Sequence, residues 1–201
     1  MIYIVSGYYR SGTSYKMEQA KAGGMDLHYN PARDDRLNAV LGLGNDHYFE
    51  IEDAEFINLL PHQSSGDGLV YGYTASYLES DEYLEIFNQF EGKTIKVLWS
   101  SLWRIPSRAK CNIIFMLRNP EEIARSIFKF TEEELSEDWI SEYWDNTDRW
   151  INALSKNHTV TAINYNRDIE SPSFPDSWPV ELSSIAKTVR PELYRNRHGS
   201  N

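Results

Sequence analysis

The first fifteen residues, MIYIVSGYYRSGTSY, constrain the fold of this chain more than any other stretch. Residues 2–5 are a short apolar run, mostly β-branched, which predicts a buried strand. Gly7 and Gly12 follow, five residues apart, and hydroxyl side chains come directly after the second glycine. A strand, a glycine-dependent turn and a helix start direct free backbone N–H groups and the positive end of the helix dipole at one point. The sequence therefore predicts a loop that binds a phosphate-like anion.

This loop differs in one respect from the loop of the nucleotide hydrolases. In those proteins the second glycine is followed by Lys and then by Ser or Thr. Here Thr13 takes the place of that Lys and Ser14 comes next, while the cation of the loop is Arg10. The two hydroxyls can donate hydrogen bonds to an anion or ligate a metal ion. The alternative is a glycine-rich turn that binds nothing.

Composition predicts a folded globular protein and disfavours a polyanionic partner unless its site is locally basic. The 201 residues are 41% apolar, which suffices for one domain with a sizeable core. The formal net charge of −10 argues against nucleic acid and disfavours a polyanionic acceptor such as heparan. The single cysteine, Cys111, excludes an internal disulfide and suits a reducing compartment. No signal peptide and no run of about 20 apolar residues is visible, so we expect a cytoplasmic protein of bacterial or phage type that does not bind membranes.

Strand and helix signals alternate along the chain. Beyond residues 2–5, strands are predicted at residues 94–99, 112–117 and 159–165, and the near-continuous apolar run at 112–117 is typical of a central parallel strand. Helices are predicted at residues 13–22, 80–90, 131–157 and 180–189 and after Asn119, with glycines 23, 24 and 92 as stop signals. This alternation predicts a single α/β domain over residues 1–201, with three α/β/α layers around a central parallel sheet.

Two of the helix starts carry capping signals. Asn119 is a good N-cap, Pro120 fits the first helical position, and Glu122 completes a capping box. Thr131 and Glu134 form a second capping box, which predicts the start of the long helix at residues 131–157.

A second candidate anion site follows the most apolar strand. Arg118 comes directly after that strand, and Ser126 comes eight residues later. Ligands of open α/β sheets bind at the carboxyl ends of the strands, and a residue about two turns into the next helix can share that face. A guanidinium and a hydroxyl together suit a phosphate dianion, which an Arg can bind in bidentate fashion. Arg118 taken alone could equally be a salt-bridged residue at a strand end.

The two candidate sites together resemble the sulfotransferases that use 3′-phosphoadenosine 5′-phosphosulfate (PAPS). In that family, Lys or Arg, then Ser-Gly-Thr, then Thr or Ser forms the loop for the 5′-phosphosulfate, which residues 10–14 match. An apolar strand, Arg-Asn-Pro, an acidic helix start and a Ser hold the 3′-phosphate, which residues 113–126 match. Shorter likenesses to bacterial sulfotransferase-like proteins lie at residues 21–24, 48–50 and 92–97, so the resemblance extends to about residue 130.

The resemblance implies a P-loop nucleotide-binding fold, PAPS as donor and 3′-phosphoadenosine 5′-phosphate (PAP) as product. The residues it implies for the cofactor are Arg10, Ser11, Gly12, Thr13 and Ser14 around the 5′-phosphosulfate, Tyr15 against adenine, and Arg118 and Ser126 at the 3′-phosphate. In the basic tail at residues 190–201, Arg195 and Arg197 are candidates for further contacts with the 3′-phosphate. Their spacing departs from the family's motif, and a frayed tail is the alternative.

The implied reaction moves a sulfuryl group in line to a hydroxyl or amine of a small-molecule or glycan acceptor, without a metal ion. Arg10 would stabilise the charge that develops on the bridging oxygen. Many cytosolic relatives carry a catalytic His in the segment that corresponds to residues 96–101, which here has none. Other sulfotransferases use a Glu from the loop that follows the first helix, so the resemblance implies Glu50 as the first candidate for the general base, with His47 and Asp46 behind it. A solvated carboxylate at a helix start is the alternative for Glu50.

The acceptor side is the least defined part of the sequence. We expect it at two loops, roughly residues 25–50 and 61–76. Lys96 and Trp99 are candidates to face the acceptor, and Trp99 fits the core equally well. The identity of the acceptor and the oligomeric state stay open.

Two other function classes stay open as well. A P-loop kinase that uses ATP with Mg²⁺ would need the loop Lys and an acidic residue at a strand end. A protein that binds PAP or PAPS without turnover would lack a general base.

Overall fold

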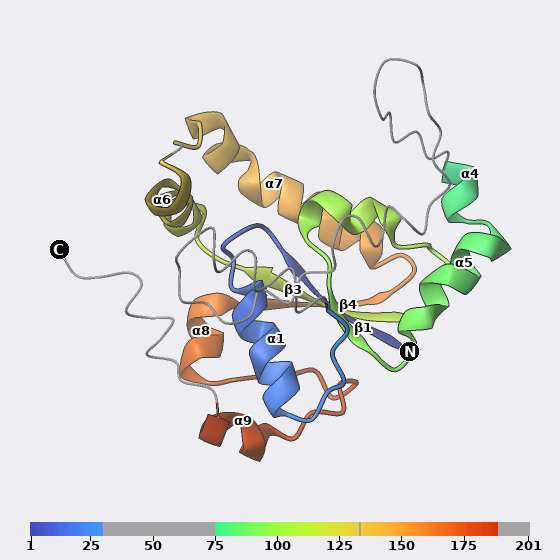
Figure 1. Cartoon of the computed structure of the whole chain (residues 1–201). Helices are drawn as coiled ribbons and strands as arrows, with labels where there is room; N and C mark the ends of the chain where they lie inside the picture. The colour runs from blue at the N-terminus through green and yellow to red at the C-terminus, as the bar shows by residue number, and fades with distance from the viewer. Residues whose placement is uncertain (30–74, 133, 189–201) are drawn as a thin grey trace.

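The computed structural model describes residues 1–29, 75–132 and 134–188 (Figure 1). The strands are β1 (Ile2–Gly7), β2 (Thr94–Lys96), β3 (Cys111–Leu117) and β4 (Thr159–Asn164). The α-helices are α1 (Thr13–Ala22), α4 (Ala75–Leu78), α5 (Asp81–Phe87), α6 (Pro120–Thr131), α7 (Glu137–Leu154), α8 (Tyr165–Glu170) and α9 (Leu182–Thr188). Two 3₁₀-helices, η1 (Asn88–Phe90) and η2 (Trp99–Arg104), complete the described elements.

The four strands form one parallel sheet in the order β2-β1-β3-β4. Tyr3 of β1 lies opposite Thr94 of β2 and Asn112 of β3, and Asn112 lies opposite Thr159 of β4. Because all strands run the same way, their carboxyl ends meet at one edge of the sheet, where ligands of such sheets bind. The predicted α/β class with a central parallel sheet is confirmed, and β1 and β3 are its inner strands.

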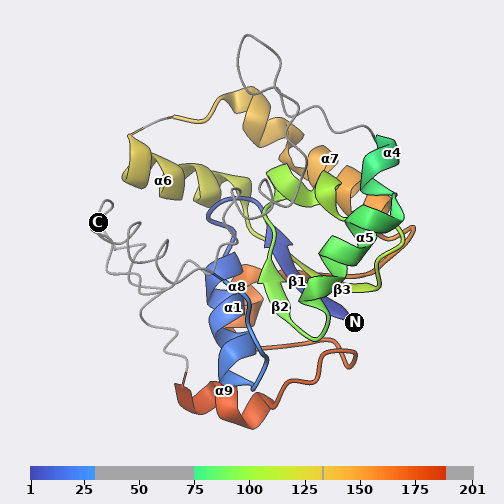
Figure 2. The ribbon, with the colours of Figure 1, turned by 45° about the vertical axis from the view of Figure 1, so that its right-hand side comes forward.

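Alternate residues of the inner strands face opposite layers. Ile4 and Phe115 pack in the cluster that contains side chains of α5, η2 and α7. Val5 and Met116 pack against α1, α8 and the segment at residues 174–180. Figures 1 and 2 show α7 on one side of the sheet and α1, α8 and α9 on the other. A sheet covered on both faces needs mostly apolar residues on both sides of its strands, which explains the continuous apolar run at residues 113–117 of β3.

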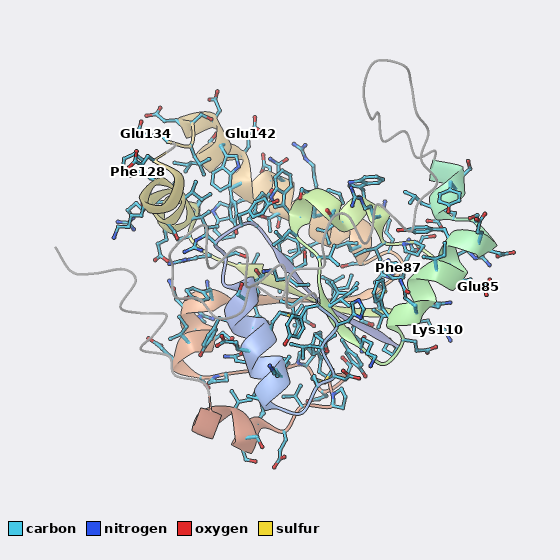
Figure 3. The ribbon with its side chains drawn as sticks, viewed as in Figure 1. Glu85, Phe87, Lys110, Phe128, Glu134 and Glu142 are labelled. Carbon is cyan, nitrogen blue, oxygen red and sulfur yellow. The ribbon has the colours of Figure 1, made fainter. Side chains whose placement is uncertain are left out.

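The outer helices show the amphipathic pattern that this layering requires. On α5, Phe87 is buried against the sheet and Glu85 is exposed (Figure 3). Ser80 caps this helix by accepting a hydrogen bond from the backbone N–H of Tyr83, as the predicted start at residue 80 requires. No helix in the described part of the chain is both long and apolar enough to span a bilayer.

The structure corrects two of the predicted boundaries. β2 ends at Lys96, and Trp99 begins the 3₁₀-helix η2 instead of ending the strand. The predicted helix at 131–157 is two helices, since α6 continues through Thr131 and α7 begins at Glu137. Glu132 ends α6 with a φ of +60°, and the Ser136 hydroxyl caps α7 by accepting from the Trp139 N–H. The capping box predicted at Thr131 is therefore wrong, because Thr131 still belongs to α6.

Candidate anion-binding site

The anion loop (residues 7–12) connects β1 to α1 at the carboxyl edge of the sheet. Its backbone turns through left-handed conformations at Arg10 and Gly12, where φ is +66° and +99°. Gly12 is the N-cap of α1 and offers no side chain to the first N–H groups of that helix. The Ser11 hydroxyl is fully buried and has no hydrogen-bond partner among the described residues. Uncapped helix N–H groups and a buried, unsatisfied hydroxyl at one turn are the features of an anion site.

Gly12 is required by the packing of the loop as well as by its backbone. A Cβ atom at this position would lie 2.1 Å from Cδ2 of Tyr165. The ring of Tyr165, the first residue of α8, therefore covers the loop directly. A residue larger than Gly would displace the ring that closes this side of the site.

Arg10 joins the anion loop to the second predicted site. Its Nε donates a hydrogen bond to the Ser126 hydroxyl on α6 at 3.0 Å. Its backbone oxygen accepts a hydrogen bond from Nη1 of Arg118 at 2.9 Å. Residues that lie 108 and 116 positions away in the sequence thus contact Arg10 directly. The structure brings the predicted residues Arg10, Arg118 and Ser126 into one site.

Arg118 is held on three sides. It is only 4% exposed, and its Nε donates to a carboxylate oxygen of Glu122 at 2.9 Å. The Tyr165 ring lies under its guanidinium, 4.7 Å from Cζ to the ring centroid. With the bond to the Arg10 oxygen, these contacts fix the plane of the guanidinium. As predicted, Asn119 is the N-cap of α6, and its side chain accepts a hydrogen bond from the Glu121 N–H.

Lys96 adds a third cation to the site. It ends β2, is 4% exposed, and its ammonium donates to the Ser14 hydroxyl at 3.1 Å. Sequence reasoning placed Lys96 on the acceptor side, and the structure places it against the start of α1. Trp99 is partly buried and stacks on Tyr8 with 4.8 Å between ring centroids, and its role toward an acceptor stays a prediction. The parallel pairing of β2 with β1 is what puts Lys96 beside the loop.

Tyr15 occupies a different environment from the one predicted. It is 1% exposed and packs edge-on against Tyr165 with 6.1 Å between ring centroids. A ring enclosed by the core offers no free face to adenine, so the predicted stacking role has no support in this placement. Thr13 is also buried, at 4% exposure, while Ser14 is half-buried. The backbone of Thr13 and Ser14, and the Ser14 hydroxyl, are the parts of these residues that lie at the site.

Several predicted residues lie outside the described part of the chain. These are the candidate bases Glu50 and His47, with Asp46, and the tail residues Arg195 and Arg197. Most of the two predicted acceptor-side loops, at residues 30–50 and 61–74, lies outside it too. Their predicted roles stay predictions.

The charges of the site suit an anion. Arg10, Lys96 and Arg118 converge on the anion loop, and Glu122 pairs with one of them. Within residues 1–29, 75–132 and 134–188, no three His, Cys, Asp or Glu side chains gather as metal ligands would. Cys111 is buried, which raises the pKa of its thiol to about 12, so it is not a nucleophile at neutral pH.

Comparison of the chain with models of protein families, with curated proteins and with solved structures found no match.

Proposed function

We propose that this chain is a sulfotransferase that transfers a sulfuryl group from PAPS to a hydroxyl or amine of a small-molecule or glycan acceptor. The observation that carries the proposal is the contact of Arg10 with both Ser126 and Arg118. The motif for a 5′-phosphosulfate and the motif for a 3′-phosphate are remote in the sequence. A nucleotide with both groups needs these motifs side by side, as they are in the fold.

The residues present fit such a nucleotide. The uncapped start of α1 and the buried Ser11 hydroxyl supply donors for the 5′ group. Arg118 and Ser126 supply a guanidinium and a hydroxyl for the 3′-phosphate. PAPS, when bound, supplies an activated sulfuryl group on a phosphate leaving group.

The chain's own residues account for the charge that moves in this reaction. The bond from sulfur to the bridging oxygen breaks as the bond from sulfur to the acceptor oxygen or nitrogen forms, and the acceptor's proton passes to a base. Negative charge develops on the bridging oxygen, which Arg10 and Lys96 can stabilise from the loop and from the end of β2. The hydrogen bonds of Arg10 to Ser126 and of Lys96 to Ser14 hold both cations in place beside the loop before the reaction.

The placement of Lys96 favours PAPS over ATP with Mg²⁺. In P-loop kinases the hydroxyl at the position of Ser14 ligates Mg²⁺. Here that hydroxyl accepts a hydrogen bond from the Lys96 ammonium instead. The residues at or just after the ends of β2, β3 and β4 are Lys96, Arg118 and Asn164, and none of these three is acidic. A fixed cation thus stands where a kinase would hold its metal ion.

The first test is thermal unfolding with PAP, with adenosine 5′-phosphate, and with ATP plus Mg²⁺. At 100 times its dissociation constant a ligand adds about 2.7 kcal/mol, or about 5–10 °C for a domain of this size. We expect this shift with PAP, and a much smaller one with the 5′-monophosphate. A shift with ATP and Mg²⁺ alone would overturn the proposal in favour of a kinase.

Arg118→Ala should lower the affinity for PAP by at least about 30-fold, because truncating a buried charged partner costs about 2–5 kcal/mol. The affinity for adenosine 5′-phosphate should change far less, since it has no 3′-phosphate. Arg108→Ala is the matched control, because Arg108 pairs with Asp81 at a half-exposed site on the surface. Arg118→Lys keeps the positive charge but loses the two-pronged guanidinium. Its affinity for PAP should lie between that of Arg118→Ala and that of Arg108→Ala.

Formation of PAP from PAPS over a panel of acceptors then tests turnover. We expect PAP to form faster with at least one hydroxyl or amine acceptor than without any. Tight binding of PAP with no acceptor-dependent turnover would identify a binding protein instead of an enzyme.

A further inference from the structure

Lys16 and Asp168 form an ion pair between α1 and α8 in which both side chains are fully buried. The Lys16 ammonium donates hydrogen bonds to Oδ1 of Asp168 at 2.8 Å and to the backbone oxygen of Ser173 at 2.6 Å. It also donates to Oε1 of Gln19, in the next turn of α1, at 2.7 Å. The Asp168 oxygen that faces Lys16 accepts a further hydrogen bond from the Ser173 N–H at 3.0 Å. One ammonium therefore joins α1 both to α8 and to the segment that follows α8.

Stability alone does not account for this pair. Removing two charges from water has a cost that their attraction often does not exceed, and apolar residues of similar volume can serve as well or better. Two further buried polar atoms, Oδ2 of Asp168 and Nε2 of Gln19, have no hydrogen-bond partner among the described residues, which adds to the cost. The pair does, however, restrict the two helices to one relative position, because in any other position a charge would be buried without its partner.

The ion pair lies one helical turn from the contact between α8 and the anion loop. Lys16 lies one turn after Gly12, and its backbone N–H donates to the Gly12 oxygen at 3.1 Å. Asp168 lies one turn after Tyr165, the first residue of α8. Residues one turn apart share a side of a helix. α1 and α8 therefore meet in two successive turns, first at the Tyr165 ring and then at the ion pair, and Figures 1 and 2 show the two helices side by side.

Tyr165 is the residue of α8 through which this arrangement reaches the site. Its ring lies so close to Gly12 that a Cβ atom there would be 2.1 Å from Cδ2, and the ring centroid lies 4.7 Å from Cζ of Arg118. α8 has only six residues, and a helix this short has little stability of its own. Its position, and with it that of the Tyr165 ring, must therefore be fixed by contacts such as the ion pair with Lys16.

We propose that Lys16 and Asp168 are positioning residues of the nucleotide site: their ion pair holds α8 against α1, so that the Tyr165 ring closes the anion loop and packs against Arg118. Both residues act through Tyr165, and neither has to contact the nucleotide. This inference rests on the proposed function, since PAP is the ligand whose affinity it concerns.

The double variant Lys16→Met with Asp168→Leu separates positioning from stability. It removes both charges and keeps the space between the helices filled, but its apolar side chains set no fixed position for α8. The affinity for PAP is measured by calorimetry well below all thermal midpoints, with and without Tyr165→Leu. Phe87→Leu is the matched control, because it alters the core on the other face of the sheet. If the double variant does not fold, Asp168→Asn replaces it in every comparison, since it removes the charge and keeps the volume.

We expect the double variant to bind PAP about 5- to 30-fold more weakly than the wild type. In proteins that carry Tyr165→Leu, the same double substitution should change the affinity by less than about twofold, because its effect passes through that ring. Phe87→Leu should bind PAP as the wild type does. An affinity that the double substitution leaves unchanged, or lowers equally with and without Tyr165→Leu, would overturn the inference.

A second comparison needs no ligand. Gly12→Ala should lower the thermal midpoint of the otherwise wild-type protein, in part because its methyl group meets the Tyr165 ring. In the double variant the ring is less constrained, so the loss should fall toward that caused by Gly24→Ala, where a Cβ atom would meet nothing within 4 Å. An equal loss in both backgrounds would contradict the positioning role. If the wild type binds no PAP, the proposed function fails, and this comparison still shows whether the ion pair positions Tyr165.

Discussion

Replacement of Lys16 by Met is expected to lower the free energy of unfolding by about 3–5 kcal/mol, the usual result of removing one partner of a buried ion pair. Lys16 is fully buried in α1, and its ammonium donates to Asp168 of α8 at 2.8 Å. Its other two hydrogen bonds go to Gln19 at 2.7 Å and to the Ser173 oxygen at 2.6 Å. Without Lys16, the carboxylate of Asp168 stays buried with no cation. Urea denaturation measures the loss, which corresponds to about 6–20 °C in the thermal midpoint.

Two further variants show whether the pair itself is responsible. Lys21→Met changes an exposed Lys at the end of the same helix and should cost less than about 1 kcal/mol. The double variant Lys16→Met with Asp168→Leu removes both charges and should be more stable than Lys16→Met alone. A double variant that loses the sum of the two single losses would show that each residue acts through packing and not through the pair.

The cost of Asp168→Asn should depend on pH. Burial lowers the pKa of Lys16 to about 8, and the attraction of Asp168 works in the opposite direction. Without that attraction the pKa of Lys16 falls further, so at pH 7 Lys16 is charged in the wild type and increasingly neutral in the variant. Above about pH 9 it is neutral in both folded proteins. The difference in unfolding free energy between wild type and variant should therefore shrink as pH rises from 7 to 9.5, and urea denaturation at both values would reveal a constant or growing difference if this is wrong.

The residues of the site that could be predicted from the sequence belong to short contiguous motifs that directly follow a strand. The anion loop, Arg118 and Ser126 each follow a strong apolar strand, and a parallel sheet brings the ends of its strands to one edge. Once the strands were identified, their meeting followed from topology. The central position of β3 was predictable as well, because five consecutive apolar residues, 113–117, make up most of this strand.

The parts that could not be predicted depend on how helices are rotated and paired. The buried residues of α1 include Tyr15, Lys16 and Gln19, so polarity along this helix does not reveal which side faces the core. The burial of Tyr15 and the pairing of Lys16 with Asp168 could not be read from periodicity for that reason. Tyr165 reaches Gly12 and Arg118 because β4 lies beside β3, a neighbour relation that no local motif encodes.

The boundary between α6 and α7 shows a conflict between two local signals. Thr131 and Ser136 are both suitable N-caps, and only the second one is used. The left-handed turn at Glu132 ends α6 one residue after Thr131, so Thr131 is helical and cannot cap the next helix. The sequence alone does not show which of Thr131 and Ser136 is the N-cap, because both residue types are favoured at that position.

Gly12→Ala is expected to abolish the stabilisation by PAP and to lower the free energy of unfolding by about 2–5 kcal/mol. A left-handed φ of +99° costs an Ala about 1–2 kcal/mol. The new methyl group would also lie 2.1 Å from Cδ2 of Tyr165, and relief of such overpacking costs about 1–3 kcal/mol more. The Tyr165 ring that must move also packs against the Arg118 guanidinium, so the substitution disturbs both the anion loop and the position of Arg118. Thermal unfolding with and without PAP measures both effects.

Gly24→Ala separates the backbone cost from the contact with Tyr165. Gly24 has a φ of +91°, close to that of Gly12, but a Cβ atom there would meet nothing within 4 Å. Its substitution should therefore show only the backbone cost of about 1–2 kcal/mol, with the shift by PAP intact. If the two variants lose equal stability and both keep the shift, the Tyr165 ring is not the wall that closes the anion loop. If Gly12→Ala alone loses the shift, the close packing of α8 on the anion loop is what makes the turn a nucleotide site and not only a connection between β1 and α1.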